Sequence, residues 1–224
     1  MPRKSVAAER RRELIPPIAA LFDSRGYHLV SVNEAARVVG LSKAALYHYF
    51  KGKESILYAI HDEFMRTVTG KIEQRIASQP PVEALCGSVG DVVSLYQTHP
   101  GYVRIFLEHH RELAPADRKA IQKKRQKYGE LVLGIVRAGI ASGDFRDDLD
   151  PEMIVRNIFG MCAWPIQWWE PDDGPELDAV VRSINAMVLG GIATAQGRRR
   201  GRRHTSTGAR IAPVAENASI SSLE

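Results

Sequence analysis

Two serines eleven positions apart mark the starts of two short helices near the N-terminus. Ser31 precedes an apolar-periodic run and is followed three residues later by Glu34, which is the spacing of a capping box. Ser42 stands in the same position before a second run, and Gly40 between the two runs permits a tight turn. Residues 31–50 therefore predict a helix-turn-helix, a motif whose second helix enters the major groove of DNA.

The apolar spacing of the second helix separates its inner side from its outer side. Leu46, Tyr49 and Phe50 are expected to face inward, so Tyr49 is more typical of core than of contact. At outward positions, lysine, histidine and tyrosine can reach phosphates or base edges, and alanine lets the helix approach the groove. A lysine at the start of the next helix can also hold a phosphate. The candidate DNA-binding residues are Ser31, Ser42, Lys43, Ala44, Ala45, Tyr47, His48, Tyr49 and Lys53.

Charge is distributed unevenly along the chain. Residues 1–53 carry 10 Lys/Arg against 4 Asp/Glu, residues 54–196 carry 15 against 20, and residues 197–224 carry 6 against 2. A basic end suits a polyanion, and double-stranded DNA is the first candidate. An anionic membrane surface would require a basic amphipathic helix with bulky apolar residues, which the N-terminal segment lacks.

The rest of the chain predicts helices separated by short breaks, with no alternating strand run. Pro16-Pro17 require the first helix to begin near Leu14 or to bend. We therefore expect an all-α protein of about nine helices. Two of these helices lie within residues 31–50. Two more end near Ser24 and near Thr98. The other five span about 52–78, 101–113, 116–142, 151–169 and 176–196.

Several classes of protein are excluded by what the sequence lacks. The sequence has no run of about 18 apolar residues, which a membrane-spanning helix would require. The basic N-terminus also has no apolar stretch typical of a secretory signal. Cys86 and Cys162 are too few and too far apart for a disulfide framework or a cysteine-rich zinc site. These features favour a protein of the reducing cytoplasm.

No catalytic or cofactor motif is present in the sequence. There is no Gly-x-Gly-x-x-Gly, no P-loop and no His-Glu-x-x-His. His109 and His110 are adjacent, and neighbouring side chains on a helix point about 100° apart, so the pair alone does not form a chelate. The expectation is a protein that is not an enzyme and that uses neither a cofactor nor a metal.

Residues 42–50 read Ser-Lys-Ala-Ala-Leu-Tyr-His-Tyr-Phe, and Lys53 and Glu54 follow. This run resembles the signature of the TetR family of bacterial regulators, and the resemblance covers residues 14–57, about a fifth of the chain. Ala44 stands where many members have glycine, and Pro16-Pro17 fall inside a helix that is usually unbroken. Upstream, further positions also match the family: Phe22, Gly26, Tyr27, Ser31, Val32, Ala36 and Gly40.

The resemblance implies a three-helix DNA-binding domain followed by a helical domain that dimerises and binds a small molecule, which releases the DNA. On this basis we expect a DNA-binding domain at 1–52 and a ligand-binding and dimerisation domain at 53–196. Residues 197–224 have an Arg-rich start and no periodicity, which predicts a disordered basic tail. A dimer with two recognition helices would read a roughly palindromic operator.

The expected helix at 151–169 carries an apolar stripe that suits a binding pocket. Ile154, Asn157, Met161, Trp164 and Trp168 recur every three or four residues and share one face. Two tryptophans, a methionine and one amide suit an apolar pocket with a polar anchor. The alternative is that this stripe is ordinary core or dimer interface.

Further residues resemble a narrower group, the TetR-like regulators of lipid and steroid catabolism. They are a Trp-Trp pair followed by Pro and Gly, Arg125 with Tyr128, and Glu108 with Arg111, although Trp169 replaces a more usual tyrosine. This resemblance implies an acyl-CoA effector. The basic residues Lys123, Lys124, Arg125 and Lys127 could hold its phosphates, or they could form a solvated helix face.

The candidate ligand-binding residues are Phe106, His109, Arg125, Tyr128, Asn157, Met161, Trp164, Trp168 and Trp169. Val181, Ile184, Val188 and Gly191, on one face of the last helix, are the candidate dimer interface.

Three other functions remain open from the sequence. Acidic residues in the pocket would favour an efflux-type regulator that senses a cationic lipophilic drug. The helical half could also be an enzyme or carrier of acyl-CoA, which turnover of the ligand would reveal. A constitutive DNA-binding protein would show no effect of any ligand on its affinity for DNA.

Overall fold

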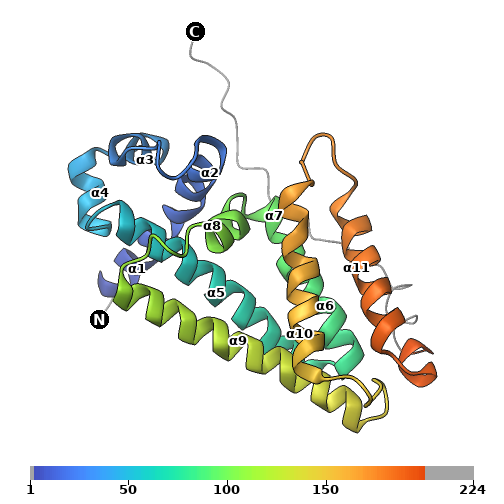
Figure 1. Cartoon of the computed structure of the whole chain (residues 1–224). Coiled ribbons are helices and arrows are strands. Elements are labelled where there is room, and N and C mark those ends of the chain that lie inside the picture. Colours follow the sequence, from blue (N-terminus) through green and yellow to red (C-terminus); the bar gives the residue numbers. More distant parts are fainter. Residues whose placement is uncertain (1–2, 200–224) are drawn as a thin grey trace.

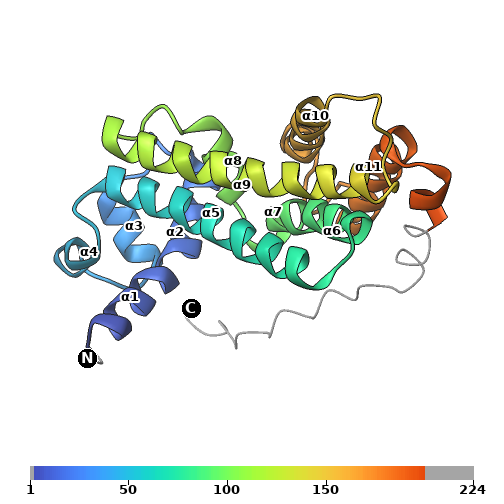
Figure 2. The same cartoon turned by 90° about the horizontal axis from the view of Figure 1, so that it is seen from below.

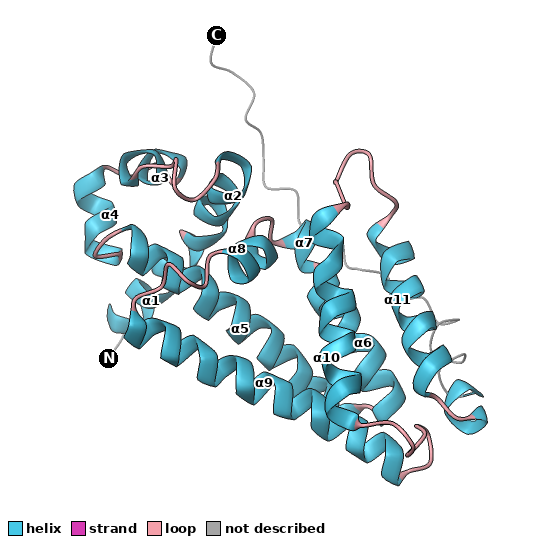
Figure 3. Ribbon diagram, viewed as in Figure 1, coloured by secondary structure: helices cyan, strands magenta, loops and turns pink. Residues whose placement is uncertain are grey.

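The computed structural model describes residues 3–199 and is helical apart from an isolated β-bridge between Phe145 and Ala193 (Figures 1 and 3). The all-α prediction is confirmed. Eleven α-helices and one 3₁₀ turn lie within residues 3–192, where the sequence predicted about nine helices for the chain. The elements are α1 (Arg3–Glu13), α2 (Ile15–Arg25), α3 (Val32–Val38), α4 (Lys43–Tyr49), α5 (Lys53–Ser78), α6 (Pro81–Val93), α7 (Leu95–Thr98), α8 (Tyr102–Glu108), α9 (Pro115–Ala141), α10 (Pro151–Ala163), η1 (Trp164–Gln167) and α11 (Leu177–Ile192).

The helices divide into two groups joined by α5. Helices α1 to α4 lie at one end, and α6, α10 and α11 lie at the other, as both views show (Figures 1 and 2). Helix α5 packs against α6, α8 and α9 and so runs through the middle of the molecule. Ile56, Ile60, Phe64 and Val68 recur every four residues along α5 and are buried. This spacing gives α5 a buried apolar face along much of its length.

The first helical segment is broken where the sequence contains two prolines. α1 ends at Glu13, and α2 begins at Ile15 with Pro16 and Pro17 in its first turn. Proline lacks an N–H, and the first turn of a helix is where that N–H has no intrahelical partner. The start near Leu14, one of the two expected alternatives, is confirmed by α2. The separate helix α1 before it was not expected.

Three other helices are shorter than expected. The helix expected to end near Thr98 is interrupted at Ser94, so that α6 and α7 are separate. α8 ends at Glu108, and the chain then turns, although the sequence suggested helix as far as Leu113. α10 ends at Ala163 and continues as the 3₁₀ turn η1, because Pro165 cannot donate a helical hydrogen bond.

Helices α2 and α8 meet in close backbone contact. A Cβ atom added to Gly101 would lie 2.4 Å from the carbonyl oxygen of Ala19 and 2.9 Å from the Cβ of Asp23. Gly101 has φ of +86°, which also favours glycine. Next to it, Arg104 Nε donates to Asp23 Oδ1 over 2.8 Å. The N-terminal group of helices is thus attached directly to the helix that begins at Tyr102.

The described part of the chain ends in a further helical turn at residues 195–199. The predicted disordered tail began at residue 197; residues 197–199 are helical, and residues 200–224 lie outside the described part. No helix within the described residues combines the length and apolar character that crossing a membrane requires.

Candidate DNA-binding surface and ligand cavity

Side-chain caps begin both helices of the predicted helix-turn-helix. The Glu34 amide donates to Ser31 Oγ over 3.2 Å, and the Ser31 amide donates to the Glu34 carboxylate over 2.8 Å, which completes the capping box. Ser42 Oγ accepts from the Ala45 amide over 3.1 Å. Gly40 in the turn has φ of +68°, a conformation that side chains disfavour. Ser31 and Ser42 therefore fix the motif by capping its helices.

The outer face of α4 presents four of the predicted contact residues to solvent. Lys43, Ala44, Tyr47 and His48 are exposed, whereas Leu46 is fully buried. Tyr47 is 44% exposed, a large value for an aromatic residue. Two of the predicted DNA-binding residues, Ala45 and Tyr49, are half-buried at the edge of this face. The face suits a groove, because a cation, an imidazole and a phenol project around a methyl group.

Lys53 has a role within the protein in addition to its predicted contact with phosphate. Its Nζ donates to the backbone carbonyl oxygen of His28 over 3.2 Å and lies 4.4 Å from the centre of the Tyr27 ring. Partial burial lowers the pKa of Lys53. The side chain therefore holds the loop between α2 and α3 against the start of α5.

An apolar cavity of about 130 Å³ lies among α5, α6, α8, α9 and α10. Three predicted ligand residues, Phe106, Arg125 and Tyr128, line it, and the Tyr128 ring stacks on Phe159 with centres 5.8 Å apart. No carboxylate is among the described residues around it. The lining residues are Phe64, Met65, Val68, Val92, Val103, Phe106, Leu107, Arg125, Tyr128, Phe159, Cys162 and Ala163.

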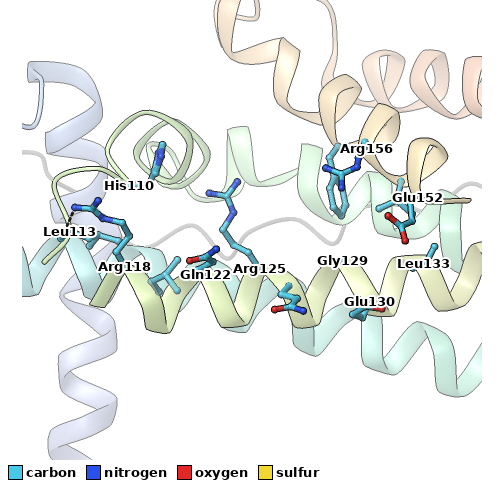
Figure 4. A pocket seen from close by; sticks show the side chains of 14 residues that line it. His110, Leu113, Arg118, Gln122, Arg125, Gly129, Glu130, Leu133, Glu152 and Arg156 are labelled. Atoms are coloured by element: carbon cyan, nitrogen blue, oxygen red, sulfur yellow. Dashed lines mark hydrogen bonds between the residues drawn. The ribbon is translucent and has the colours of Figure 1, made fainter. Parts of the chain in front are cut away.

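A wider, more polar cavity of about 680 Å³ adjoins the apolar one between α9 and α10. Arg125 and Phe159 line both cavities, so the two spaces are neighbours. Figure 4 shows the Arg125 side chain rising from α9 into the space between His110 and Arg156. Arg118 and two carboxylates, Glu130 and Glu152, also line this outer cavity, which makes its surface mixed in charge.

Arg125 stands at the boundary of the two cavities without a carboxylate partner among the described residues. Its guanidinium carbon lies 4.8 Å from the centre of the Phe106 ring. Burial lowers the pKa of Arg125, yet an arginine remains charged at neutral pH. An unneutralised cation next to an apolar chamber can bind the anionic group of a ligand whose apolar part enters the chamber.

Two other members of the predicted basic cluster are already paired. Lys124 Nζ contacts the Asp62 carboxylate, and Lys127 Nζ lies 2.7 Å from Glu73 Oε1, both on α5. These ion pairs attach α9 to α5. Lys123 is exposed on α9. Of the four basic residues in this cluster, Arg125 alone lines the cavities.

The structure separates the remaining predicted ligand residues from these cavities. Asn157, Met161, Trp164 and Trp168 line a different feature, an open groove of about 850 Å³ between α10 and α11. Trp164 is 65% exposed there. The core side of α10 carries another stripe, Val155, Phe159 and Cys162. That second stripe also has helical spacing, and it could have identified Phe159 and Cys162, which were not predicted.

Trp169 and His109 also lie apart from the apolar cavity. Trp169 is buried against Tyr96, and its Nε1 donates to the carbonyl oxygen of Pro175 over 3.0 Å, which fixes the loop before α11. His109 Nδ1 lies 3.2 Å from Glu112 Oε1, beside His28 of the DNA-binding end. Neither residue lines the two neighbouring cavities.

The predicted dimer residues face mostly into their own chain. Ile184 and Val188 are buried, and Val181 lies against Gly90 of α6. Gly191 is exposed, and so is Met187, which lines the groove between α10 and α11. Ile184 also lines this groove, so one of the four predicted dimer residues borders it.

A histidine is buried without hydrogen-bond partners beneath α8. His61 is fully buried, and neither of its ring nitrogens has a partner among the described residues. Its ring lies 5.4 Å from that of Phe106. Burial, with a smaller contribution from the positive charge of Arg125, lowers the pKa of His61 to about 3. His61 is therefore neutral at physiological pH.

The exposed helix-turn-helix and the separate helical domain with its cavities define a helix-turn-helix DNA-binding regulator. Residues 18–60 match the bacterial regulatory proteins of the tetR family, and residues 78–192 match the tetracyclin repressor-like C-terminal domain. The chain belongs to the TetR family.

Similarity to individual proteins extends over most of the chain. The chain is 27% identical over 195 residues to the HTH-type transcriptional repressor KstR2 of Mycolicibacterium smegmatis, covering 86% of this chain and 95% of that protein. The structure of the ketosteroid transcriptional regulator KstR2 of Mycobacterium tuberculosis matches with a TM-score of 0.74 and 26% identity, over 83% and 95% of the two chains. AibR in complex with isovaleryl coenzyme A and operator DNA matches with a TM-score of 0.70 and 26% identity, over 80% and 97%.

Proposed function

We propose that this protein is a cytoplasmic transcriptional repressor that binds a palindromic operator as a homodimer and is released by an acyl-CoA. The observation that carries the effector proposal is the unpaired Arg125 between an apolar cavity and a polar one. The acyl group enters the inner cavity, and a CoA phosphate binds the guanidinium from the outer one. AibR, a similar protein, is described in complex with isovaleryl coenzyme A and operator DNA.

The volume of the inner cavity favours a small acyl group. It measures about 130 Å³, close to the roughly 150 Å³ of an apolar protein cavity that accepts benzene. A short or branched acyl chain has this size, whereas a steroid ring system does not. The absence of carboxylates among the described lining residues also argues against a cationic drug as effector.

The groove between α10 and α11 supports the homodimer. It is lined by apolar side chains that are exposed in one chain, with Trp164 at 65% and Met187 at 66%. Exposed large apolar patches mark protein interfaces. A second copy packed here about a two-fold axis would form an interface from α10 and α11 of both chains. The same axis would relate the two α4 helices, one in each chain.

The test is the release of operator DNA. Labelled duplexes from the DNA flanking the gene are titrated with the protein, and fluorescence anisotropy is followed on addition of isovaleryl-CoA, palmitoyl-CoA, free CoA and the free acids. We expect the short branched thioester to release DNA at the lowest concentration, and free CoA and free acids to have no effect. Release by a lipophilic cation but by no thioester would contradict the acyl-CoA proposal and support the efflux-type alternative.

A further inference from the structure

Three potential metal ligands meet where the DNA-binding end touches the ligand-binding half. His28 lies between α2 and α3, and His109 and Glu112 lie between α8 and α9. His28 Nε2 and His109 Nδ1 are each 3.2 Å from Glu112 Oε1. One donor atom from each residue falls within 4.8 Å of the other two.

We propose that His28, His109 and Glu112 bind a divalent transition metal of the Zn²⁺ class. Two zinc ligands at about 2.0–2.1 Å and a tetrahedral angle lie about 3.3 Å apart, which agrees with the two observed spacings. Two imidazoles and one carboxylate are donors that zinc prefers, and a three-residue set leaves a position for water.

The carboxylate of Glu112 offers a second observation that points to a cation. Its Oε2 is buried and has no hydrogen-bond partner among the described residues, while both histidines approach Oε1. A cluster held only by hydrogen bonds leaves that buried oxygen unsatisfied, which is costly. A cation bound by both oxygens of the carboxylate would give Oε2 a partner and remove this cost.

The surroundings hold the three side chains in place while leaving access from solvent. Lys53 fixes the His28 backbone through the carbonyl oxygen, and the His28 and His109 rings pack against Tyr27 at 5.1 and 5.2 Å. The side chains of His109 and Glu112 are 17% and 27% exposed, whereas that of His28 is 69% exposed. The metal can therefore enter from the His28 side and would connect the two halves of the protein.

The experiment is a calorimetric titration of tag-free, full-length protein with ZnCl₂, with MgCl₂ as the hard-cation control. We expect one zinc per chain and no magnesium binding, and a higher Tm with zinc because the metal binds the folded state. His28→Ala and Glu112→Gln should each weaken zinc binding at least about tenfold. His110→Asn, at the neighbouring histidine outside the cluster, should leave the zinc affinity unchanged.

His28→Ala decides the result even if a variant at the more buried His109 does not fold, because the exposed His28 imidazole can be removed without opening the core. Co²⁺ in place of zinc reports the coordination through its visible absorption, which is strong for four ligands and weak for six. Zinc affinity that is equal in wild type, His28→Ala and Glu112→Gln would overturn the proposal. So would binding that depends on His110, or no saturable binding by the wild type.

Discussion

The guanidinium carbon of Arg125 on α9 lies 4.8 Å from the centre of the Phe106 ring on α8. Phe106 in turn packs on Phe64 of α5, with ring centres 4.3 Å apart. A cation–π contact orients a guanidinium without neutralising it, so the charge stays available to an anion. Three helices therefore converge on the point where the apolar and polar cavities adjoin.

Replacing Arg125 by glutamine should weaken acyl-CoA binding by about 10- to 100-fold, because a charged hydrogen bond to phosphate contributes roughly 1.5–3 kcal/mol. Affinity for operator DNA without ligand should not change. Isothermal titration calorimetry with isovaleryl-CoA measures the first effect. Lys123→Gln, which removes an exposed charge from the same helix, is the matched control. Equal affinity in Arg125→Gln and wild type would remove Arg125 from the site.

Lys43→Ala should weaken operator binding and make it less sensitive to salt. A lysine that contacts one phosphate in each subunit releases counterions, so its loss should reduce the slope of log K against log salt by about one for each contact. Anisotropy titrations between low and moderate salt measure this slope. Lys119→Ala, at an exposed position of α9, should leave the slope unchanged. A slope that is the same in wild type and Lys43→Ala would mean that this side chain contacts no phosphate.

Met187→Asp should dissociate the homodimer. Met187 is 66% exposed in the groove between α10 and α11, and a carboxylate buried there by a second copy would lose its hydration and disrupt an apolar contact. We expect the dimer dissociation constant to rise at least about tenfold in sedimentation velocity. Met153→Asp introduces the same charge at a methionine that is 50% exposed outside the groove. If both variants sediment as the wild type does, the interface lies elsewhere.

The buried His61 should make the protein sensitive to acid. Its pKa is lowered to about 3 by burial, whereas an unfolded histidine has a pKa near 6.5. Between these values the unfolded chain binds the extra proton, so stability falls as the pH falls. Each pH unit below about 6 should cost the wild type roughly 1 kcal/mol relative to His61→Leu.

Urea unfolding at pH 7, 6 and 5 measures this difference between wild type and His61→Leu. The variant should unfold near the wild-type midpoint at pH 7, since His61 makes no hydrogen bond that would be lost, and should be the more stable protein at pH 5. Midpoints that fall in parallel with pH would show that His61 is protonated as readily in the folded protein as in the unfolded chain.

The DNA-binding motif was predictable because each signal in it is local. The Ser31 and Ser42 caps act on amides three residues away, and the spacing of Leu46 identifies the inner side of α4. The same was true of α10, where Asp150 accepts from the Glu152 amide and Pro151 occupies the first position. The apolar cavity was only partly predictable, because five helices contribute to it and their packing is not encoded in any one segment.

The ligand residues predicted on α10 lie on a different side of the helix from the one that lines the apolar cavity, and the reason is physical. The helix carries two apolar stripes, one with Met161 and Trp164 and one with Val155 and Phe159, and periodicity alone does not say which is buried. The cluster of His28 with Glu112 was beyond sequence reasoning, because these residues are 84 positions apart. From the sequence alone, the adjacent pair His109-His110 does not form a chelate and no metal is expected. The structure brings His28 and Glu112 next to His109.

The absence of a side chain at Gly101 has a consequence for how the two halves communicate. The backbone of α2 occupies the place where a Cβ atom of residue 101 would lie. Arg104 is also bound to Asp23, so α8 packs tightly against the DNA-binding end. Phe106 lies on the same short helix and lines the apolar cavity. A ligand that displaces the Phe106 ring would therefore shift α8, and α8 would shift α2. A signal from the cavity to the DNA-binding helices then requires no flexible linker, because closely packed helices move together as a rigid body.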